Sequence, residues 1–463
     1  MVKIEKNKSL QNAIDHLELL RFWLFVENQK ITYSNIDLKK EFLTLFARVY
    51  KDVFRNSKKS LYCNFISEKI KRFESPDLSH VSNETLVSKL KKHFFFGCKI
   101  EYRLLMAVEL MVLCQMLEEQ LNSESIMNAL NLSKKQMNLL SMTLCERKSK
   151  VRVLESFLEY YEKNCAYKEK KLFNVGICAT MSAGKSTFVN ALLGNDYLPV
   201  RNEATTAKIM SIYDNDYLPQ IVGYSINNAG VLDFDNNLNE KKINQWNTEN
   251  EISRIVLQSD LDNIGNFNGI MVVHDTPGTN NSGNTNHHDV TFDFLKNNRM
   301  DVLVYVSNVE HMMTVDEKNL LEELQEKIVK KQKLSVLFIV NKIDNLDRSK
   351  DGSAEDIKRD YESWLKTELG YKKLKVLAVS AKAARIFKML LKGKGNMLTE
   401  KEQDDLQGLV RRFTRGFKKE ASSETLLPKD IVVGDDTYSS VLIRQALENT
   451  GIKQIEKELE NYI

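Results

Sequence analysis

The chain has 463 residues, of which 42% are hydrophobic and 28% charged, a composition typical of soluble globular proteins with more than one core. Its 67 basic and 63 acidic side chains leave a formal net charge of only +4, which makes a nucleic-acid partner an unfavoured interpretation. No stretch approaches the roughly 18 uncharged apolar residues of a membrane-spanning helix, so any membrane contact would be peripheral.

The six cysteines contain no C-x-x-C pair, and several lie in apolar runs. This pattern is typical of reduced core cysteines rather than of disulfides or a zinc site. We therefore expect a cytoplasmic protein, with peripheral attachment at the inner membrane as the alternative.

Residues 1–148 carry apolar side chains at helical spacing, for example Leu10, Ile14 and Leu17, which predicts an all-helical N-terminal domain. Tyr102–Gln120 is apolar on most faces and is the predicted central helix. Residues 149–170 are charged and amphipathic, and we expect them to form a connecting helix.

From residue 171 to 392, apolar strands alternate with helices, which predicts an α/β domain with a mostly parallel sheet covered on both faces. The predicted strands are Phe173–Ala179, Ala207–Tyr213, Gln220–Tyr224, Gly269–His274, Val302–Ser307, Ser335–Val340 and Lys375–Val379. The predicted helices are Lys185–Leu193, Asp289–Asn297, Val315–Gln332, Ala354–Leu369 and Ala381–Lys392.

Two polar segments interrupt this pattern. Asn227–Leu261 is rich in Asn, Asp and Gln, and we expect a peripheral insertion there. Residues 393–436 are low in hydrophobicity and are predicted to form a mobile insertion. The last segment, 437–463, is expected to be one terminal helix, Tyr438–Tyr462, packed on the α/β domain.

A phosphate-binding loop lies between the first strand and first helix of this domain. It follows the pattern G-x-x-x-x-G-K-[ST], with alanine in the first place, over Ala179, Thr180, Met181, Ser182, Ala183, Gly184, Lys185, Ser186 and Thr187. Backbone N–H groups at a helix N-terminus bind anions, Lys185 neutralises the terminal phosphates, and the Ser186 hydroxyl ligates Mg²⁺. Because alanine tolerates positive φ poorly, we expect slight strain at Ala179.

Two further motifs predict contacts to a γ-phosphate and its metal. Thr205 and Thr206 lie about twenty residues beyond Lys185, where a threonine can contact Mg²⁺ and the attacking water. Asp275 begins the motif D-T-P-G at the end of an apolar strand and can hold Mg²⁺ through water, while the N–H of Gly278 can contact the γ-phosphate.

Two motifs then predict that the base is guanine. In Asn341-Lys342-Ile343-Asp344, the Asp344 carboxylate can accept from guanine N1–H and its exocyclic amine, a pattern that adenine does not offer. Asn341 would tie this loop to the phosphate loop, and the stem of Lys342 would lie over the base. In Ser380-Ala381-Lys382, a backbone N–H is expected to meet guanine O6. Each motif follows a predicted strand, where such folds bind their ligands.

The stretch ATMSAGKSTFVNALLGNDYLPVRNEATTA, joined by DTPG, NKID and the terminal NTGIKQIEKELENYI, resembles the dynamin superfamily of large GTPases, in its bacterial dynamin-like branch. The resemblance covers roughly residues 170–392 and the last helix. It implies GTP hydrolysis to GDP and phosphate through nucleotide-dependent homodimerisation of the GTPase domains. It also implies a role in membrane remodelling or in scaffold assembly.

The same resemblance implies roles for individual residues. Ser182 matches the serine that positions the catalytic water and a monovalent cation, and Lys185 matches the catalytic lysine. Thr206 best matches the threonine that completes the metal shell with Ser186 and Asp275, and Thr205 is the close alternative. Thr279 stands where small GTPases carry a catalytic glutamine, which fits hydrolysis assisted by a dimer.

Members of this family continue past the position of Tyr462 into a helical stalk with a lipid-binding tip. We expect that the N-terminal helices supply this part as a shortened bundle, that a stalk-bearing partner chain supplies it, or that the gene product is truncated. An alternative function is a nucleotide-switched adaptor with slow hydrolysis, whose helical domain recruits a protein partner.

The basic and aromatic segment Arg411–Lys419 admits two interpretations. It would suit an anionic membrane surface or a nucleic-acid backbone, but a solvated helix face within the mobile insertion is favoured.

Overall fold

The computed structural model describes residues 170–199, 208–216, 221–227, 230–235, 238–265, 268–278, 285–347, 349–372, 374–415, 430–434 and 436–463, with short pieces at 71, 107, 124, 128 and 132–136. The chain divides into two compact units, 1–170 with 233–236, and 171–232 with 237–463. The predicted helical domain and connecting helix lie almost wholly outside the described residues.

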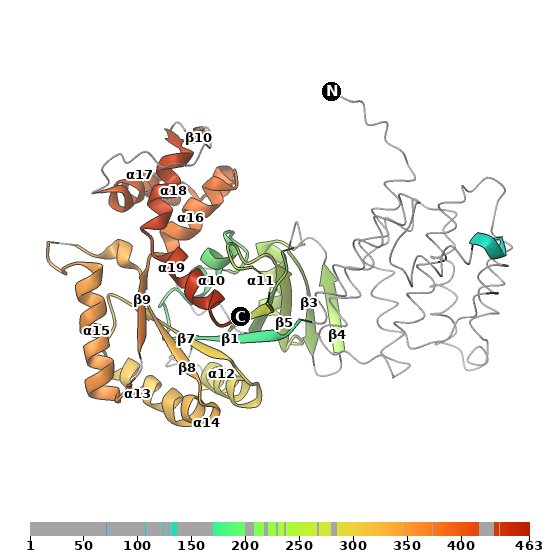
Figure 1. The fold of residues 1–463 in the computed structure, drawn as a ribbon, viewed down its shortest axis with the longest axis horizontal. Coiled ribbons are helices and arrows are strands. Elements are labelled where there is room, and N and C mark those ends of the chain that lie inside the picture. The colour runs from blue at the N-terminus through green and yellow to red at the C-terminus, as the bar shows by residue number, and fades with distance from the viewer. Residues whose placement is uncertain are drawn as a thin grey trace. The chain divides into compact units, whose positions relative to one another are not determined.

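The second unit is built on a nine-stranded, mostly parallel sheet, which confirms the predicted α/β class (Figure 1). The strand order is β4-β3-β5-β2-β6-β1-β7-β8-β9. The strands are β1 (Leu172–Ala179), β2 (Ile209–Asp214), β3 (Val222–Asn227), β4 (Gly230–Asp235), β5 (Arg254–Ser259), β6 (Ile270–Asp275), β7 (Val302–Asn308), β8 (Ser335–Asn341) and β9 (Lys375–Val379). A separate hairpin pairs β10 (Asp430–Val433) with β11 (Asp436–Ser439).

Helices cover both faces of this sheet. They are α10 (Lys185–Leu193), α11 (Glu240–Thr248), α12 (Thr285–Asn297), α13 (Val315–Leu324), α14 (Lys330–Gln332), α15 (Ala354–Leu369), α16 (Ala381–Leu391), α17 (Glu400–Thr414), α18 (Ser440–Glu448) and α19 (Ile452–Glu460). A π-helical stretch, Gln325–Val329, joins α13 to α14, and 3-10 turns occur at Ile343–Asn345 and Gly395–Met397. Among the helices that the structure describes, none has the length and apolar character needed to cross a bilayer.

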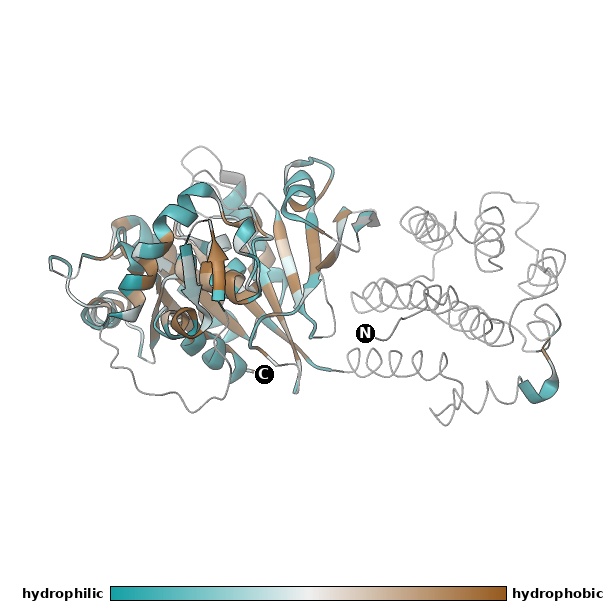
Figure 2. Ribbon diagram, turned by 90° about the horizontal axis from the view of Figure 1, so that it is seen from above, coloured by the Kyte–Doolittle hydropathy of each residue, from teal (hydrophilic) through white to brown (hydrophobic). Residues whose placement is uncertain are grey.

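The two faces of the sheet form separate cores because side chains alternate along each strand. On one face, Val175 and Ile177 of β1 pack with α10 and α16–α19. On the other face, Cys178 of β1 packs with α12, α13 and α15. Figure 2 shows the resulting apolar strands between helices whose outer faces are hydrophilic. Since both faces are buried, the central strands are apolar throughout, which is why the sequence predicts them well.

The predicted peripheral insertion at Asn227–Leu261 is wrong. Strand β5 lies inside the sheet, parallel to β2 and antiparallel to β3. Helix α11 buries Ile243 and Trp246 completely. A short strand and a helix of nine residues need only a few apolar positions to join the core. Because the segment as a whole is rich in polar residues, its average hydrophobicity did not indicate β5 and α11.

The predicted mobile insertion at 393–436 is also corrected over its described part. Helix α17 begins with a capping box, in which Thr399 and Glu402 satisfy each other's backbone N–H groups. It buries Leu406, Val410 and Phe413 in the same core as α10 and α16. Residues 416–429 lie outside the described residues.

The predicted terminal helix is divided in two, although it does pack on the α/β core as expected. Gly451 separates α18 from α19 with φ +86°, and a Cβ there would lie 2.0 Å from the carbonyl oxygen of Ala378. A helix cannot pass this point because the backbone touches β9. Only glycine fits such a close approach in the left-handed region.

A buried ion pair fixes the C-terminal end of α10 against α16 and α19. The side chains of Lys388 and Glu456 are 1% and 2% exposed and form an ion pair, and Lys388 Nζ lies 3.3 Å from Asp262. Lys388 Nζ also donates to the Leu192 carbonyl at 3.4 Å, at the negative end of the α10 dipole. Lys392 makes a similar but more exposed contact to Asp262 at 3.3 Å.

Replacing Lys388 by methionine should therefore lower the free energy of unfolding by about 3–5 kcal/mol, because Glu456 would remain buried without its cation. Urea unfolding of the full chain, followed by tryptophan fluorescence, measures the change. Lys392→Met is the matched control, with an expected loss of about 0–1 kcal/mol because that pair is solvated. Equal losses in the two variants would contradict the assignment.

Candidate functional site

The predicted motifs meet at one edge of the sheet. Strands β6, β1, β7, β8 and β9 run parallel, so their carboxyl ends lie together. In this register Ile177 pairs with Asp275, and Asn341 pairs with Val379. The loops that follow these strands therefore share a single surface, where α/β sheets bind ligands.

The phosphate loop leads into α10 through a left-handed residue. Gly184 is the N-cap of this helix, with φ +83°. Strain expected at Ala179 is absent, because this residue ends β1 and does not have positive φ. Ser182 instead takes the left-handed conformation, with φ +61°. Ala179 can therefore occupy the place of the first glycine in the pattern, because the backbone there is extended and does not require positive φ.

Lys185, Ser186 and Asp275 form a buried polar cluster at the start of α10. Lys185 Nζ makes an ion pair with Asp275 Oδ1, and Ser186 Oγ donates to Asp275 Oδ2 at 3.3 Å. The three residues are 7%, 8% and 0% exposed. Thr276 donates to the Ile177 carbonyl at 2.7 Å, which fixes the start of D-T-P-G beside β1. A cation, a hydroxyl and a carboxylate thus converge where the sequence predicts phosphate and metal.

The predicted contacts of Thr205 and Thr206 cannot be placed, because both threonines lie outside the described residues. Gly278 is described, and a Cβ on it would lie 3.6 Å from Cα of Met181. The D-T-P-G segment therefore runs close to the phosphate loop. Met181 is exposed at this point, while Thr180 and Thr187 are partly buried.

The Asn341 side chain joins the phosphate loop to the two loops that the sequence predicts to contact guanine. Its Nδ2 donates to the Ala183 carbonyl at 2.9 Å, and its Oδ1 accepts from the Ala381 N–H at 3.1 Å. Because the Ala381 N–H is already used in this way, another N–H of the 380–382 loop would have to meet guanine O6. One buried amide therefore sets the spacing of the two loops.

Asp344 stands in the 3-10 turn that follows Asn341. Its Oδ1 accepts from the Ser380 hydroxyl at 2.6 Å, so one oxygen is oriented by the neighbouring loop. Lys342, before this turn, has φ +65°. The Lys382 ammonium pairs with Asp405 of α17 at 2.6 Å. Asp344 and Ser380, both predicted to lie at the base, are thus in contact. Lys382 is held by a helix that the sequence placed in a mobile segment.

A buried polar chain behind Asp275 was not predicted. His274 Nδ1 lies 2.9 Å from Ser211 Oγ, its Nε2 lies 3.1 Å from Asn174 Oδ1, and Arg254 donates to Ser211 at 2.7 Å. Burial, with the nearby Arg254 cation, lowers the pKa of His274 to about 3, so the imidazole is neutral. Single polar residues inside apolar strands were the signal that could have revealed this chain. It fixes the strand that carries Asp275.

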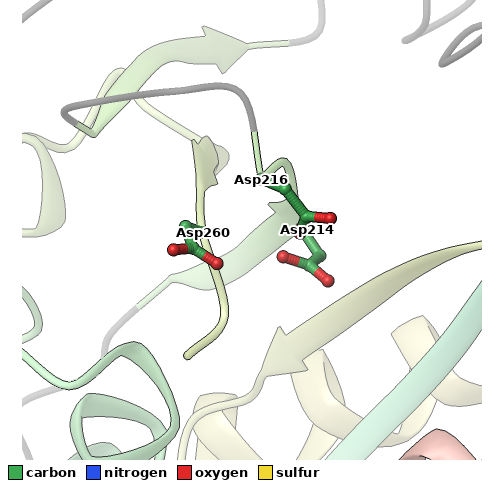
Figure 3. Close-up of side chains that lie close together, drawn as sticks. All are labelled: Asp214, Asp216 and Asp260. Carbon is green, nitrogen blue, oxygen red and sulfur yellow. The ribbon is translucent and has the colours of Figure 1, made fainter. Parts of the chain in front are cut away.

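Figure 3 shows a second acidic group, Asp214, Asp216 and Asp260, whose carboxylate oxygens lie within 4.8 Å of one another. Asp214 Oδ1 accepts from the Leu261 N–H at 2.8 Å. Strand β2 is antiparallel to β6, with Met210 opposite Asp275. The group therefore lies at the opposite edge of the sheet and is not part of the site described above.

Comparison with known proteins finds a family model and two curated relatives that match part of this chain. Residues 175–343 match a family model described as the Dynamin family. An uncharacterized protein in the xynA 3' region of Caldicellulosiruptor sp. (strain Rt8B.4) is 29% identical over 182 residues, which is 38% of this chain and 41% of that protein. Uncharacterized protein R618 of Acanthamoeba polyphaga mimivirus is 26% identical over 196 residues, with coverage of 39% and 30%. The chain thus spans less than half the length of these curated relatives.

Solved structures show weaker likeness. A chain from an oligomerised bacterial dynamin pair, described as a mechanism for the long-range sensing and tethering of membranes, is 18% identical with a TM-score of 0.39, over 91% of this chain and 66% of that one. Toc33 from Arabidopsis thaliana, in complex with GDP and Mg²⁺, is 16% identical with a TM-score of 0.27, over 49% and 78%. The segment that matches the Dynamin family model, residues 175–343, thus runs from the strand before the phosphate loop to the turn after Asn341.

Proposed function

We propose that this chain binds GTP with Mg²⁺, hydrolyses it to GDP and phosphate, and does so through a nucleotide-dependent homodimer. The observation that carries the proposal is the Asn341 bridge, which joins the phosphate loop at Ala183 to the base-reading loop at Ala381. A phosphate site and a guanine site held at a fixed spacing suit a guanine nucleotide as one ligand.

The phosphates bind at the N-terminus of α10. Backbone N–H groups of the loop and the helix dipole attract anions there. Lys185 is the cation of this site, and phosphate oxygens replace Asp275 as its partner when the nucleotide enters. Release of Asp275 leaves that carboxylate close to Ser186 for a second task.

The donor set at Ser186 and Asp275 fits Mg²⁺. A hydroxyl and a carboxylate oxygen 3.3 Å apart are the hard oxygen ligands that this ion prefers. Mg²⁺, when bound, neutralises charge on the phosphates. Thr206 remains a predicted third ligand, and the water- and monovalent cation-positioning role of Ser182 also remains a prediction.

Asp344 selects the base. The Ser380 hydroxyl bonds one carboxylate oxygen and so orients the group, while the carboxylate keeps lone pairs for guanine N1–H and the exocyclic amine. Adenine presents an acceptor where guanine presents N1–H, so the carboxylate would be left without a donor. This mismatch is the physical basis of the proposed selectivity.

Exposed apolar side chains at the same edge support the homodimer. Met181 follows β1 and is 41% exposed, while Met313 and Val315 follow β7 and are 37% and 73% exposed. Strands β1 and β7 are neighbours, so these residues follow the carboxyl ends of two adjacent strands at that edge. Burial of such side chains favours association of two copies across the bound nucleotides. A cytoplasmic location and a role at membranes or in a scaffold stay predictions from the sequence.

Lys185→Ala should weaken binding of a fluorescent GDP analogue about 10- to 100-fold, because charge-assisted hydrogen bonds to phosphate are lost. GTP turnover should fall by at least about a hundredfold, measured as phosphate release. Since this change also leaves Asp275 buried without its cation, Ser186→Ala is the companion variant. It keeps the ion pair and should lose turnover and the Mg²⁺ dependence of binding. Normal turnover in both variants would overturn the site.

Asp344→Asn should lower GTP affinity about a hundredfold and raise xanthosine triphosphate affinity, because one acceptor becomes a donor. Asparagine retains an oxygen for the Ser380 hydroxyl, so the loop should keep its shape. Competition binding with both nucleotides measures the preference. Asp347→Asn, which changes an exposed carboxylate just beyond the same turn, is the control and should bind as the unaltered chain does. An unchanged preference in Asp344→Asn would show that another group reads the base.

Light scattering should show the monomer mass with GDP and the dimer mass with GDP and aluminium fluoride, a transition-state mimic. Val315→Asp should weaken that dimer, and an acidic residue at the start of α13 should not harm the fold. Val432→Asp changes a similarly exposed valine on β10 and should leave the dimer intact. A constant monomer mass would instead favour the nucleotide-switched adaptor.

A further inference from the structure

Helix α17 reaches the guanine-reading loop through one side chain. Arg412 Nη2 donates to the Ile343 carbonyl at 3.0 Å and to the Leu346 carbonyl in the same turn. The sequence pattern suggested that this arginine belongs to a solvated or membrane-facing basic segment. The structure directs it inward, onto the backbone on either side of Asp344.

The turn that carries Asp344 makes only two backbone hydrogen bonds of its own, from Asn345 N–H to the Lys342 carbonyl at 2.9 Å and from Leu346 N–H to the Ile343 carbonyl. It has only three residues in 3-10 conformation, Ile343–Asn345, and begins after a left-handed Lys342. The N–H of Leu346 returns to the Ile343 carbonyl at a long 3.4 Å. Ile343 and Leu346 are both buried, and the bond within the turn is long and reaches only the Ile343 carbonyl, so a further donor to the two carbonyls stabilises the turn. The planar guanidinium of Arg412 supplies that donor to both.

The same helix contacts the second guanine-reading loop. Asp405, about two turns before Arg412, pairs with Lys382 at 2.6 Å. Both partners are more than a third exposed, so this ion pair by itself contributes little. The ion pair is informative because of where it lies. Through Asp405 and Arg412, α17 contacts both the loop that carries Ser380 and the turn that carries Asp344.

Helix α17 is a firm support for these contacts. Leu406, Val410 and Phe413 are buried in the core, and the Phe413 ring meets Phe387 of α16 edge to face at 6.3 Å. At its C-terminal end, Asn449 Nδ2 donates to the Phe413 carbonyl at 2.6 Å. Val410 and Phe413, the buried residues on either side of Arg412 in the sequence, are thus fixed by packing.

We propose that Arg412 is a positioning residue for guanine recognition: it holds the carbonyls of Ile343 and Leu346, and thereby keeps the Asp344 carboxylate in place for the base. The inference rests on the proposed function, since it concerns the same nucleotide site. It assigns to α17 a role in base selectivity and none in phosphate binding.

The test measures base and phosphate binding separately in the full chain with Mg²⁺. A fluorescent GDP analogue is displaced by GDP, by inosine diphosphate, which lacks the exocyclic amine, and by inorganic pyrophosphate. In Arg412→Ala, GDP affinity should fall about tenfold and the preference for GDP over inosine diphosphate should shrink, while pyrophosphate affinity stays unchanged. Arg412→Lys, which restores one donor, should recover part of the preference.

Arg411→Ala is the matched control, because this neighbouring arginine is exposed on the same helix, and it should bind like the unaltered chain. Unchanged GDP affinity in Arg412→Ala would overturn the inference and leave the proposed function standing. Equal losses for GDP and pyrophosphate would also overturn it, because they would indicate a general structural role. If the unaltered chain binds no guanine nucleotide, the proposed function fails and the inference fails with it.

Discussion

The arrangement of the nucleotide edge depends on the side-chain amide of Asn341. This amide is buried, and both of its ends are used, one by the Ala183 carbonyl and one by the Ala381 N–H. It thereby fixes how far the phosphate loop lies from the base-reading loop. Gly184 shares the constraint, because a Cβ on it would come within 2.5 Å of Asn341 Nδ2. Glycine is needed there both for its positive φ and for this contact.

A second layer of contacts holds the base-reading loops from the C-terminal side. Ser380 donates its N–H to the Thr450 carbonyl at 2.9 Å, and Gly451 lies against the backbone of Ala378. Arg412 reaches the turn that carries Asp344. Residues 395–415 and 436–463 therefore support the loops of the proposed nucleotide site, and the break between α18 and α19 is a consequence of close packing on β9.

The sequence predicted the central strands and the motifs after them because buried parallel strands are apolar throughout and end at polar loops. It failed for α11 and α17, whose apolar residues are spaced among polar and charged ones, and for β5, whose short apolar run at residues 255–257 lies in a segment that is polar on average. It also placed strain at Ala179, whereas the non-glycine residue of this loop with positive φ is Ser182. Loop conformation depends on how a strand ends against its neighbours, and the G-x-x-x-x-G-K-[ST] pattern does not contain that information.

By itself, the sequence predicted which groups would contact phosphate, metal and base, and their order along the chain: the lysine and serine of the phosphate loop, the aspartate at the end of β6, and Asp344. These follow from chemistry, since phosphate, Mg²⁺ and guanine each require particular donors and acceptors. Only the tertiary structure decided which groups support them. Arg412 contacts the turn that carries Asp344, and His274, the residue before Asp275, contacts Ser211. Both contacts join residues far apart in the chain. Such contacts depend on how the helices pack over the sheet, and the spacing of residues within a motif does not predict that packing.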